Sequence, residues 1–183
     1  MGYPERERYA AMFAATYEPV LAYCLRRADL EGAEEAVAET FIVAWRRFDS
    51  IPDDPLPWLF SVARKVLANQ RRTAERAEDV ATRFTLEVRS RLERTVDPEE
   101  RVIEREAAGE ALERLTPEDT EILRLVAWEG LSIEQAAKAM GMTREQFDVR
   151  LHRARRRLER ELRNMEGRPR PEGESGTTGG EAG

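Results

Sequence analysis

The chain has 183 residues and 41% hydrophobic content, which is enough for one or two small domains with cores of modest size. Its net charge of -6 excludes a generic nucleic-acid coat protein, so any contact with DNA must come from local basic patches or a partner's help. The high charge, the many Ala, Glu, Arg and Leu residues and the lack of alternating β-branched runs predict an all-α protein.

Residues 1–8 are charged and have no long apolar run, so we expect no signal peptide, no membrane span and a cytoplasmic location. Cys24 is the only cysteine, and its apolar neighbours indicate a buried, inert thiol. His152 is the only histidine, so no Cys/His metal cluster is possible, and no phosphate loop or Ser/His/Asp set is visible. We therefore expect no cofactor, no metal and no enzymatic activity.

Two amphipathic helices are predicted before residue 49. Pro19 lacks an amide donor, so we expect a kink or a new helix start near Glu18 in the first helix. The second helix is expected to begin at Ala33. The apolar stripe of the first helix consists of Tyr9, Phe13, Tyr17, Val20, Leu21, Cys24 and Leu25, and that of the second consists of Val37, Phe41, Ala44, Trp45 and Phe48.

An acidic stretch covers residues 29–39, with five acids and no base. Glu34, Glu35 and Glu39 point away from the apolar stripe of the second helix. Composition leaves two readings open, a solvated surface or a docking face for a basic partner.

Residues 49–57 form a loop, because three prolines, three aspartates and a serine cannot continue a helix. Pro57 can begin the next helix, which carries Trp58 inward and a net charge of +4 over residues 64–76. Such a surface suits single-stranded DNA, where bases stack on rings and arginines meet phosphates. A plain solvated helix with Trp58 in the core is the other reading, and is slightly favoured on this segment alone.

Residues 77–105 lack an apolar stripe and are predicted to be a flexible linker. Thr116, followed by proline and two acids, is a strong helix start, and Gly130 is expected to end that helix. The predicted domains are residues 1–76 and 106–165, and residues 166–183 form a glycine-rich tail that should be disordered.

The second domain contains a helix, a sharp turn and a longer helix. Ser132 and Gln135 have capping-box spacing, Gly141 can end the short helix, and Thr143 with Gln146 repeats the box at once. On the longer helix the inward positions are Phe147, Leu151, Ala154, Leu158 and Leu162, and arginines occupy most of the rest. This pattern is typical of a helix-turn-helix whose second helix enters the DNA major groove.

Charge supports this interpretation over that of an ordinary helical bundle. Residues 143–163 hold eight arginines and four acids, whereas residues 106–142 hold eight acids and three bases. This polarisation puts positive charge where phosphates would lie.

Two segments resemble bacterial RNA polymerase sigma factors of the extracytoplasmic-function group. Residues 33–41 (AEEAVAETF), Trp45 and residues 58–64 (WLFSVAR) resemble sigma region 2. Residues 112–117 (LERLTP), 131–137 (LSIEQAA), Gly141 and 150–155 (RLHRAR) resemble sigma region 4. The resemblance spans residues 9–162, and it implies two small helical domains on a flexible linker.

The resemblance implies three surfaces. Glu34, Glu35, Ala38 and Glu39 would bind the β′ clamp helices of core RNA polymerase, which also offers its β flap to the second domain. The residues implied in melting and reading the minus-ten element are Asp49, Ser50, Ile51, Asp53, Trp58, Arg64 and Lys65. Those implied in binding the minus-thirty-five element are Arg144, Asp148, Val149, Arg150, His152, Arg153, Arg155 and Arg156.

Two positions depart from the family pattern. Ala38 stands where glutamine is frequent, so one polar contact to the polymerase is expected to be missing. Asp148 stands where a basic residue is frequent, and it would repel phosphates and could only accept a hydrogen bond, for instance from cytosine N4. We therefore expect an unusual minus-thirty-five preference.

The resemblance implies an alternative sigma factor that binds core polymerase and promoter DNA and directs initiation, with an anti-sigma factor as a further candidate partner. Two alternatives stay open. A sigma mimic would bind an anti-sigma protein without directing transcription, and a stand-alone helix-turn-helix repressor would bind duplex DNA without polymerase.

Overall fold

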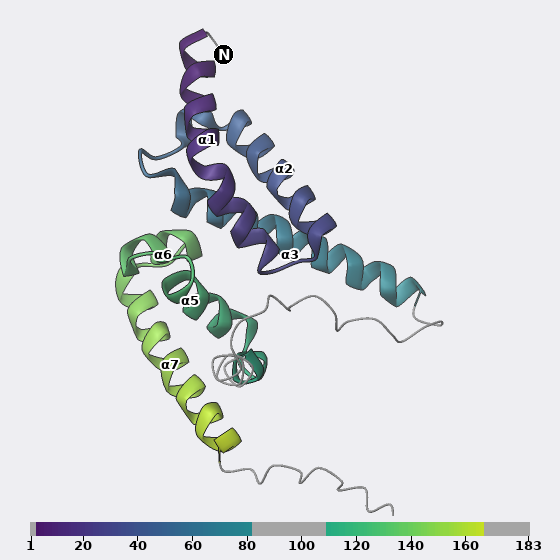
Figure 1. Cartoon of the computed structure of the whole chain (residues 1–183), viewed down its shortest axis with the longest axis vertical. Coiled ribbons are helices and arrows are strands. Elements are labelled where there is room, and N and C mark those ends of the chain that lie inside the picture. Colours follow the sequence, from purple (N-terminus) through teal and green to yellow (C-terminus); the bar gives the residue numbers. More distant parts are fainter. Residues whose placement is uncertain (1–2, 82–108, 167–183) are drawn as a thin grey trace, which may run out of the picture.

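The computed structural model describes residues 3–81 and 109–166, and every regular element within these ranges is a helix (Figure 1). This confirms the predicted all-α fold. The elements are α1 (Tyr3–Leu25), α2 (Leu30–Arg46), the short 3-10 helix η1 (Phe48–Ser50), α3 (Pro55–Ala81), α5 (Pro117–Ala127), α6 (Ile133–Met140) and α7 (Arg144–Glu166). Residues 109–113 form a helical segment before α5. The predicted linker beyond residue 81 and the tail after residue 166 lie outside the described residues.

The first domain is a bundle of α1, α2 and α3, each of which packs against the other two (Figure 1). Burying the apolar stripes of three amphipathic helices against one another supplies the main stabilising force. The buried side chains include Val20, Tyr23, Cys24, Val37, Phe41, Leu59, Phe60 and Ala63. An aromatic group joins α1 to α2, since Tyr9 meets Trp45 edge-on at 4.8 Å and donates a hydrogen bond to the Phe41 carbonyl.

The structure corrects one of the two outcomes expected near Glu18, because no new helix starts there; the kink stays a prediction. Helix α1 runs without interruption through Pro19. Val20, Tyr23 and Cys24, all just beyond the proline, are fully buried. Their burial offsets the hydrogen bond that proline cannot donate, because tertiary packing supplies most of the stability of helices in proteins.

Two predicted helix starts also differ, and four residues of the predicted apolar stripes are exposed. Helix α2 starts at Leu30 rather than Ala33, because the Asp29 side chain accepts a hydrogen bond from the Gly32 amide and caps the helix earlier. Helix α3 starts at Pro55 rather than Pro57, and it continues to Ala81. The exposed residues of the predicted stripes are Phe13, Tyr17, Leu25 and Trp45, with exposed fractions of 37%, 37%, 44% and 39%.

The second domain packs α5 and α6 against α7. Thr116 caps α5 through the Asp119 amide, and Ser132 and Gln135 form the predicted capping box of α6. Gly141 ends α6 in the left-handed conformation (φ 68°), which costs glycine little. The chain therefore turns sharply into α7, as Figure 1 shows. Buried side chains of this domain include Ile122, Leu125, Ala136, Met140, Phe147, Leu151 and Ala154.

The two domains also contact each other. Helix α6 of the second domain packs across α3 of the first. Their contact is as extensive as that between α1 and α3 within the first domain. Leu67 of α3 and Met140 of α6 are both buried and line the same boundary. This arrangement decides which of the predicted surfaces are open to solvent.

Candidate nucleic-acid interface

Helix α7 presents the predicted minus-thirty-five residues on one solvent-facing side. Phe147, Leu151 and Ala154 are buried against α5 and α6, which fixes the rotation of the helix about its axis. The residues left exposed include all of the predicted set, namely Arg144, Asp148, Val149, Arg150, His152, Arg153, Arg155 and Arg156. A shallow hollow of about 300 Å³ lies among Asp148, Val149, Leu151, His152, Arg153 and Arg155.

Two arginines of α7 are held within the domain. Arg150 forms an ion pair with Glu118, and Arg157 forms one with Asp119, both at the start of α5. Arg150 and Glu118 are each about half exposed, so their mutual attraction is weak and a phosphate can compete for the guanidinium. Arg157 instead helps to fasten α7 to α5.

The predicted polymerase-binding residues form one exposed strip on α2. Glu34, Glu35, Ala38 and Glu39 are all solvent-facing, while Ala36, Val37 and Thr40 on the opposite side are buried. Gln70 of α3 approaches this strip and donates a 3.5 Å hydrogen bond to Glu35. The strip therefore offers three carboxylates to a basic partner.

The predicted minus-ten residues are divided between an open loop and a covered helix. Asp49, Ser50, Asp53 and Lys65 are exposed. Ile51 and Trp58 are partly buried against the first domain's core. Arg64 is partly buried too, and its Nε has no hydrogen-bond partner among the described residues.

Arg64 faces the second domain across a cleft of about 320 Å³. One side of the cleft is lined by the turn after α1 and by α3, and the other side by α5, α6 and the turn after α6. The lining residues include Arg27, Arg64, Leu67, Arg71, Glu121, Met140 and Met142. Near one end of α3, Gln135 donates a 2.8 Å hydrogen bond to Asp54 in the loop that precedes the helix. The side of α3 predicted to meet DNA is thus partly covered.

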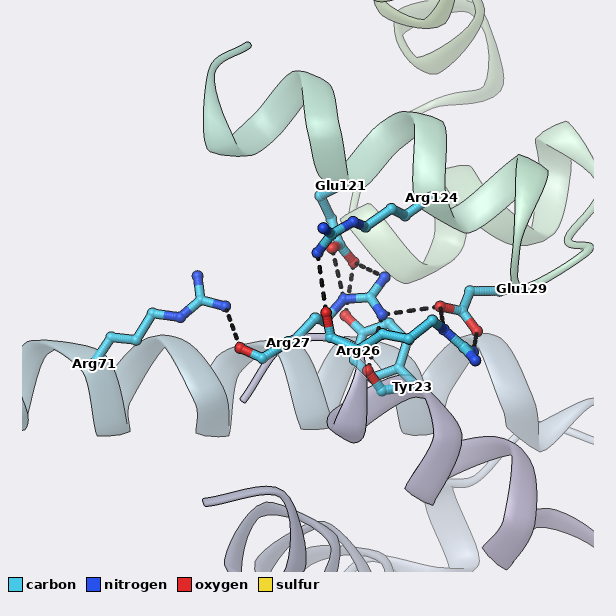
Figure 2. Close-up of polar contacts among 7 residues, drawn as sticks. All are labelled: Tyr23, Arg26, Arg27, Arg71, Glu121, Arg124 and Glu129. Carbon is cyan, nitrogen blue, oxygen red and sulfur yellow. Dashed lines mark hydrogen bonds and ion pairs between the residues drawn. The ribbon is translucent and has the colours of Figure 1, made fainter. Parts of the chain in front are cut away.

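A charged cluster joins the end of α1 to α5 (Figure 2). Arg27 Nε donates to Glu121 at 2.8 Å, and Arg27 Nη1 donates to Glu129 at 2.9 Å. Glu129 also pairs with Arg26, and the Tyr23 hydroxyl donates to Glu121 at 2.7 Å. The side chains of Arg27 and Glu129 are only 3% and 2% exposed, so contacts between these charges replace their contacts with water.

Backbone contacts surround the cluster. Arg124 donates to the Arg26 carbonyl at 3.1 Å, and Arg71 of α3 donates to the Arg27 carbonyl at 3.1 Å. The guanidinium of Arg27 lies over the Tyr23 ring at 3.5 Å from its centroid, and Tyr23 stacks on Phe60. These contacts tie the cluster into the core of the first domain.

The titration of these groups reflects burial. Burial raises the pKa of Tyr23 well above its usual value, and the nearby Glu121 carboxylate raises it further. Burial alone would lower the pKa of Arg27, but Tyr23 and Glu121 more than compensate, so its pKa rises. Cys24 is buried, as predicted, and burial raises the pKa of its thiol to about 11, so the thiol is protonated at neutral pH.

The sequence reasoning missed this cluster. The only signal was the excess of acid over residues 106–142, which includes Glu121 and Glu129, together with the adjacent Arg26 and Arg27. Pairing residues about a hundred positions apart requires the tertiary fold. No described helix has the length and apolar character needed to cross a membrane. Within residues 3–81 and 109–166, no group of acidic, cysteine or histidine side chains is placed to hold a metal ion.

Comparison with known proteins assigns both domains. Residues 12–77 match the sigma-70 region 2 family, and residues 105–158 match the sigma-70 region 4 family. The ECF RNA polymerase sigma factor SigL of Mycobacterium tuberculosis is 30% identical over 164 residues, which cover 85% of this chain and 92% of the relative. The ECF sigma factor BldN of Streptomyces coelicolor is 31% identical over 136 residues, 71% of this chain and 50% of the relative.

Solved structures share the fold. The sigma factor RpoE of Bartonella quintana, in complex with the anti-sigma factor NepR, aligns with a TM-score of 0.66 at 22% identity and covers 86% of this chain and 98% of its own. CnrH, in complex with the cytosolic domain of CnrY, aligns with a TM-score of 0.58 at 19% identity and covers 87% and 90%. At these identities the likeness establishes the fold alone.

Proposed function

Because the chain belongs to the extracytoplasmic-function group of RNA polymerase sigma factors, we propose that this alternative sigma factor binds core polymerase and directs promoter recognition, melting and initiation. It acts as a dissociable specificity subunit in the cytoplasm, and it has no catalytic role of its own. The observation that carries the proposal is the helix-turn-helix with its capped turn at Gly141 and an exposed basic face on α7.

Each surface has one proposed task. The acidic strip of α2, residues Glu34, Glu35, Ala38 and Glu39, binds the β′ clamp helices, and the second domain binds the β flap. The loop before α3, with Trp58, Arg64 and Lys65, unstacks and holds the minus-ten strand. The exposed face of α7 reads the minus-thirty-five element through Asp148, Val149, His152 and Arg153, while arginines contact phosphates.

Weak separate sites explain why a partner is needed. The net charge of the chain is -6, so electrostatic attraction to DNA comes only from small patches. Polymerase would hold the two DNA-binding domains on one scaffold, and the effective concentration would turn two weak contacts into one specific one.

Run-off transcription with core polymerase and a promoter library tests the proposal. We expect transcripts that depend on this chain and share one pair of promoter elements. A Glu34→Lys and Glu35→Lys variant should lose both polymerase capture and transcription, whereas Glu31→Lys, exposed near the start of α2, is the matched control. A chain that captures polymerase but gives no transcript from any promoter would reject the proposal.

Regulation by an anti-sigma factor is a further part of the proposal. Of the two structural neighbours described above, RpoE is bound to the anti-sigma factor NepR, and CnrH is bound to the cytosolic domain of CnrY. A sigma mimic would share that binding, and the departures at Ala38 and Asp148 are the features that favour it. Capture of core polymerase by the purified chain separates the two roles, because a mimic should fail it.

A further inference from the structure

We propose that Arg27, Glu121 and Glu129 form a latch that keeps the two domains of the free chain closed over the DNA-facing side of α3. The proposal rests on the function proposed above and adds its regulation. The latch is defined by the 2.8 Å and 2.9 Å contacts of Arg27 to the two glutamates, with Arg26 and Tyr23 as accessory partners. Arg27 belongs to the first domain and both glutamates belong to the second.

The closed arrangement covers a functional surface. Arg64 lines the cleft between the domains, and its Nε is buried without a hydrogen-bond partner among the described residues. An arginine in this state is better satisfied by a phosphate than by the closed fold. The hydrogen bond from Gln135 to Asp54 holds the second domain against the loop that precedes α3. The closed arrangement therefore restricts the access of a DNA strand to Arg64.

The closed arrangement leaves the other surfaces open. The acidic strip of α2 and the outer face of α7 are exposed. Polymerase can thus bind the closed chain first, and DNA strand capture follows when the domains separate. This order prevents the free chain from engaging single-stranded nucleic acid elsewhere in the cell.

The interface is suited to opening. Buried side chains lie within each domain, with Leu59 and Phe60 in the first and Phe147 and Leu151 in the second, and the two groups meet in one apolar cluster where α6 crosses α3. The boundary between them keeps an unfilled cleft of about 320 Å³, so the packing there is incomplete. The free-energy cost of removing charges from water is only roughly offset by their attraction to each other. Separation of the domains hydrates Arg27, Glu121 and Glu129 again, so the loss of their pairing is largely compensated. A partner can therefore shift the balance with modest binding energy.

A reversible cross-link tests the latch on the full chain. Asp54→Cys and Gln135→Cys place thiols where the two side chains now touch, and a short bis-methanethiosulfonate linker can join them. We expect run-off transcription by the linked protein to fall by roughly tenfold or more, because the linker depletes the open state that captures the DNA strand. Dithiothreitol should restore transcription to the level of the same double variant before linking, so the unlinked variant is the control both for folding and for the loss of Asp54. Equal transcription by the linked and reduced forms would overturn the latch, whereas loss of transcription in both forms and in the wild type would overturn the proposed function instead.

A second measurement needs no polymerase. The double variant Glu121→Gln and Glu129→Gln leaves Arg27 buried and unpaired in the closed form only, so it should favour opening. We expect a larger radius of gyration by X-ray scattering and roughly tenfold tighter binding of a mixed-sequence single-stranded DNA 20-mer. The double variant Glu110→Gln and Glu134→Gln changes the same net charge at exposed positions of the second domain and should bind like the wild type. If both double variants match in size and in affinity, the latch proposal is wrong.

Discussion

Arg27 and Glu129 are 102 residues apart in the chain, yet their guanidinium and carboxylate lie 2.9 Å apart and are almost fully buried. A buried pair of this kind contributes little net stability when intact, but loss of one partner costs several kcal/mol because a charge is left without water. Arg27 also serves the first domain, since its Nη1 donates to the Tyr23 carbonyl at 2.9 Å. The relative position of the domains therefore depends on these buried charges as well as on the apolar contact between α3 and α6.

Alkaline pH should weaken the fold through Tyr23. Its folded pKa lies above the unfolded value of about 10, so both states keep the proton below pH 10 and the stabilisation there is complete. Above pH 10 the unfolded chain releases the proton while the folded chain keeps it. The free energy of unfolding should then fall by up to about 1.4 kcal/mol per pH unit from this group. Urea unfolding between pH 8 and 11.5 measures this slope.

Tyr23→Phe isolates that contribution from other groups. At pH 8 the variant should lose about 1 kcal/mol, because the 2.7 Å hydrogen bond to Glu121 is gone. The deficit should shrink above pH 10 and reverse by about pH 11, since phenylalanine has no proton to lose. A deficit that stays constant up to pH 11.5 would contradict the assignment.

Gly141→Ala should destabilise the second domain by about 1–2 kcal/mol. Gly141 has φ 68°, and no atom lies near enough to clash with an added methyl group, so the cost is backbone strain alone. Thermal unfolding measures it. Gly109→Ala is the matched control, because Gly109 is also uncrowded and has no positive φ. Gly109→Ala should lose no stability; an equal loss in both variants would show that strain at the turn is not the cause.

Phe147→Ala should cost about 3–5 kcal/mol of stability, because Phe147 is fully buried on the inner face of α7. The second domain would then no longer hold α7 in place, and promoter-dependent transcription should fail. Val149→Ala, two residues along and 50% exposed, should leave the melting temperature nearly unchanged while altering promoter preference. Equal melting temperatures for the two variants would refute the assigned orientation of α7.

Arg156→Ala should weaken DNA binding by the holoenzyme about equally for all promoters. Its exposed side chain is proposed to contact phosphate, so the slope of log affinity against log salt should fall by about one. Arg157→Ala is the comparison, since Arg157 pairs with Asp119 within the domain. That variant should change stability and leave the salt slope unaltered. A slope unchanged by Arg156→Ala would remove this residue from the interface.

Local chemistry made much of the second domain predictable. Ser132 with Gln135, Gly141, and Thr143 with Gln146 form the expected caps, with both capping-box bonds present at each helix start. The spacing of Phe147, Leu151 and Ala154 likewise gave the buried side of α7, and hence the exposed arginines. These features depend on residues at most a few positions apart. The new helix start predicted near Glu18 was wrong, because burial of residues beyond Pro19 outweighed the lost hydrogen bond.

The sequence by itself determined two all-α domains, their caps, their apolar stripes and the location of the positive charge, because helical periodicity and capping act over a turn or two of chain. Only the tertiary structure decided that Arg27 meets Glu121 and Glu129, and that Arg64 faces the second domain while the acidic strip of α2 stays open. Contacts between residues about a hundred positions apart depend on how two finished domains dock. No local pattern in the sequence encodes that geometry.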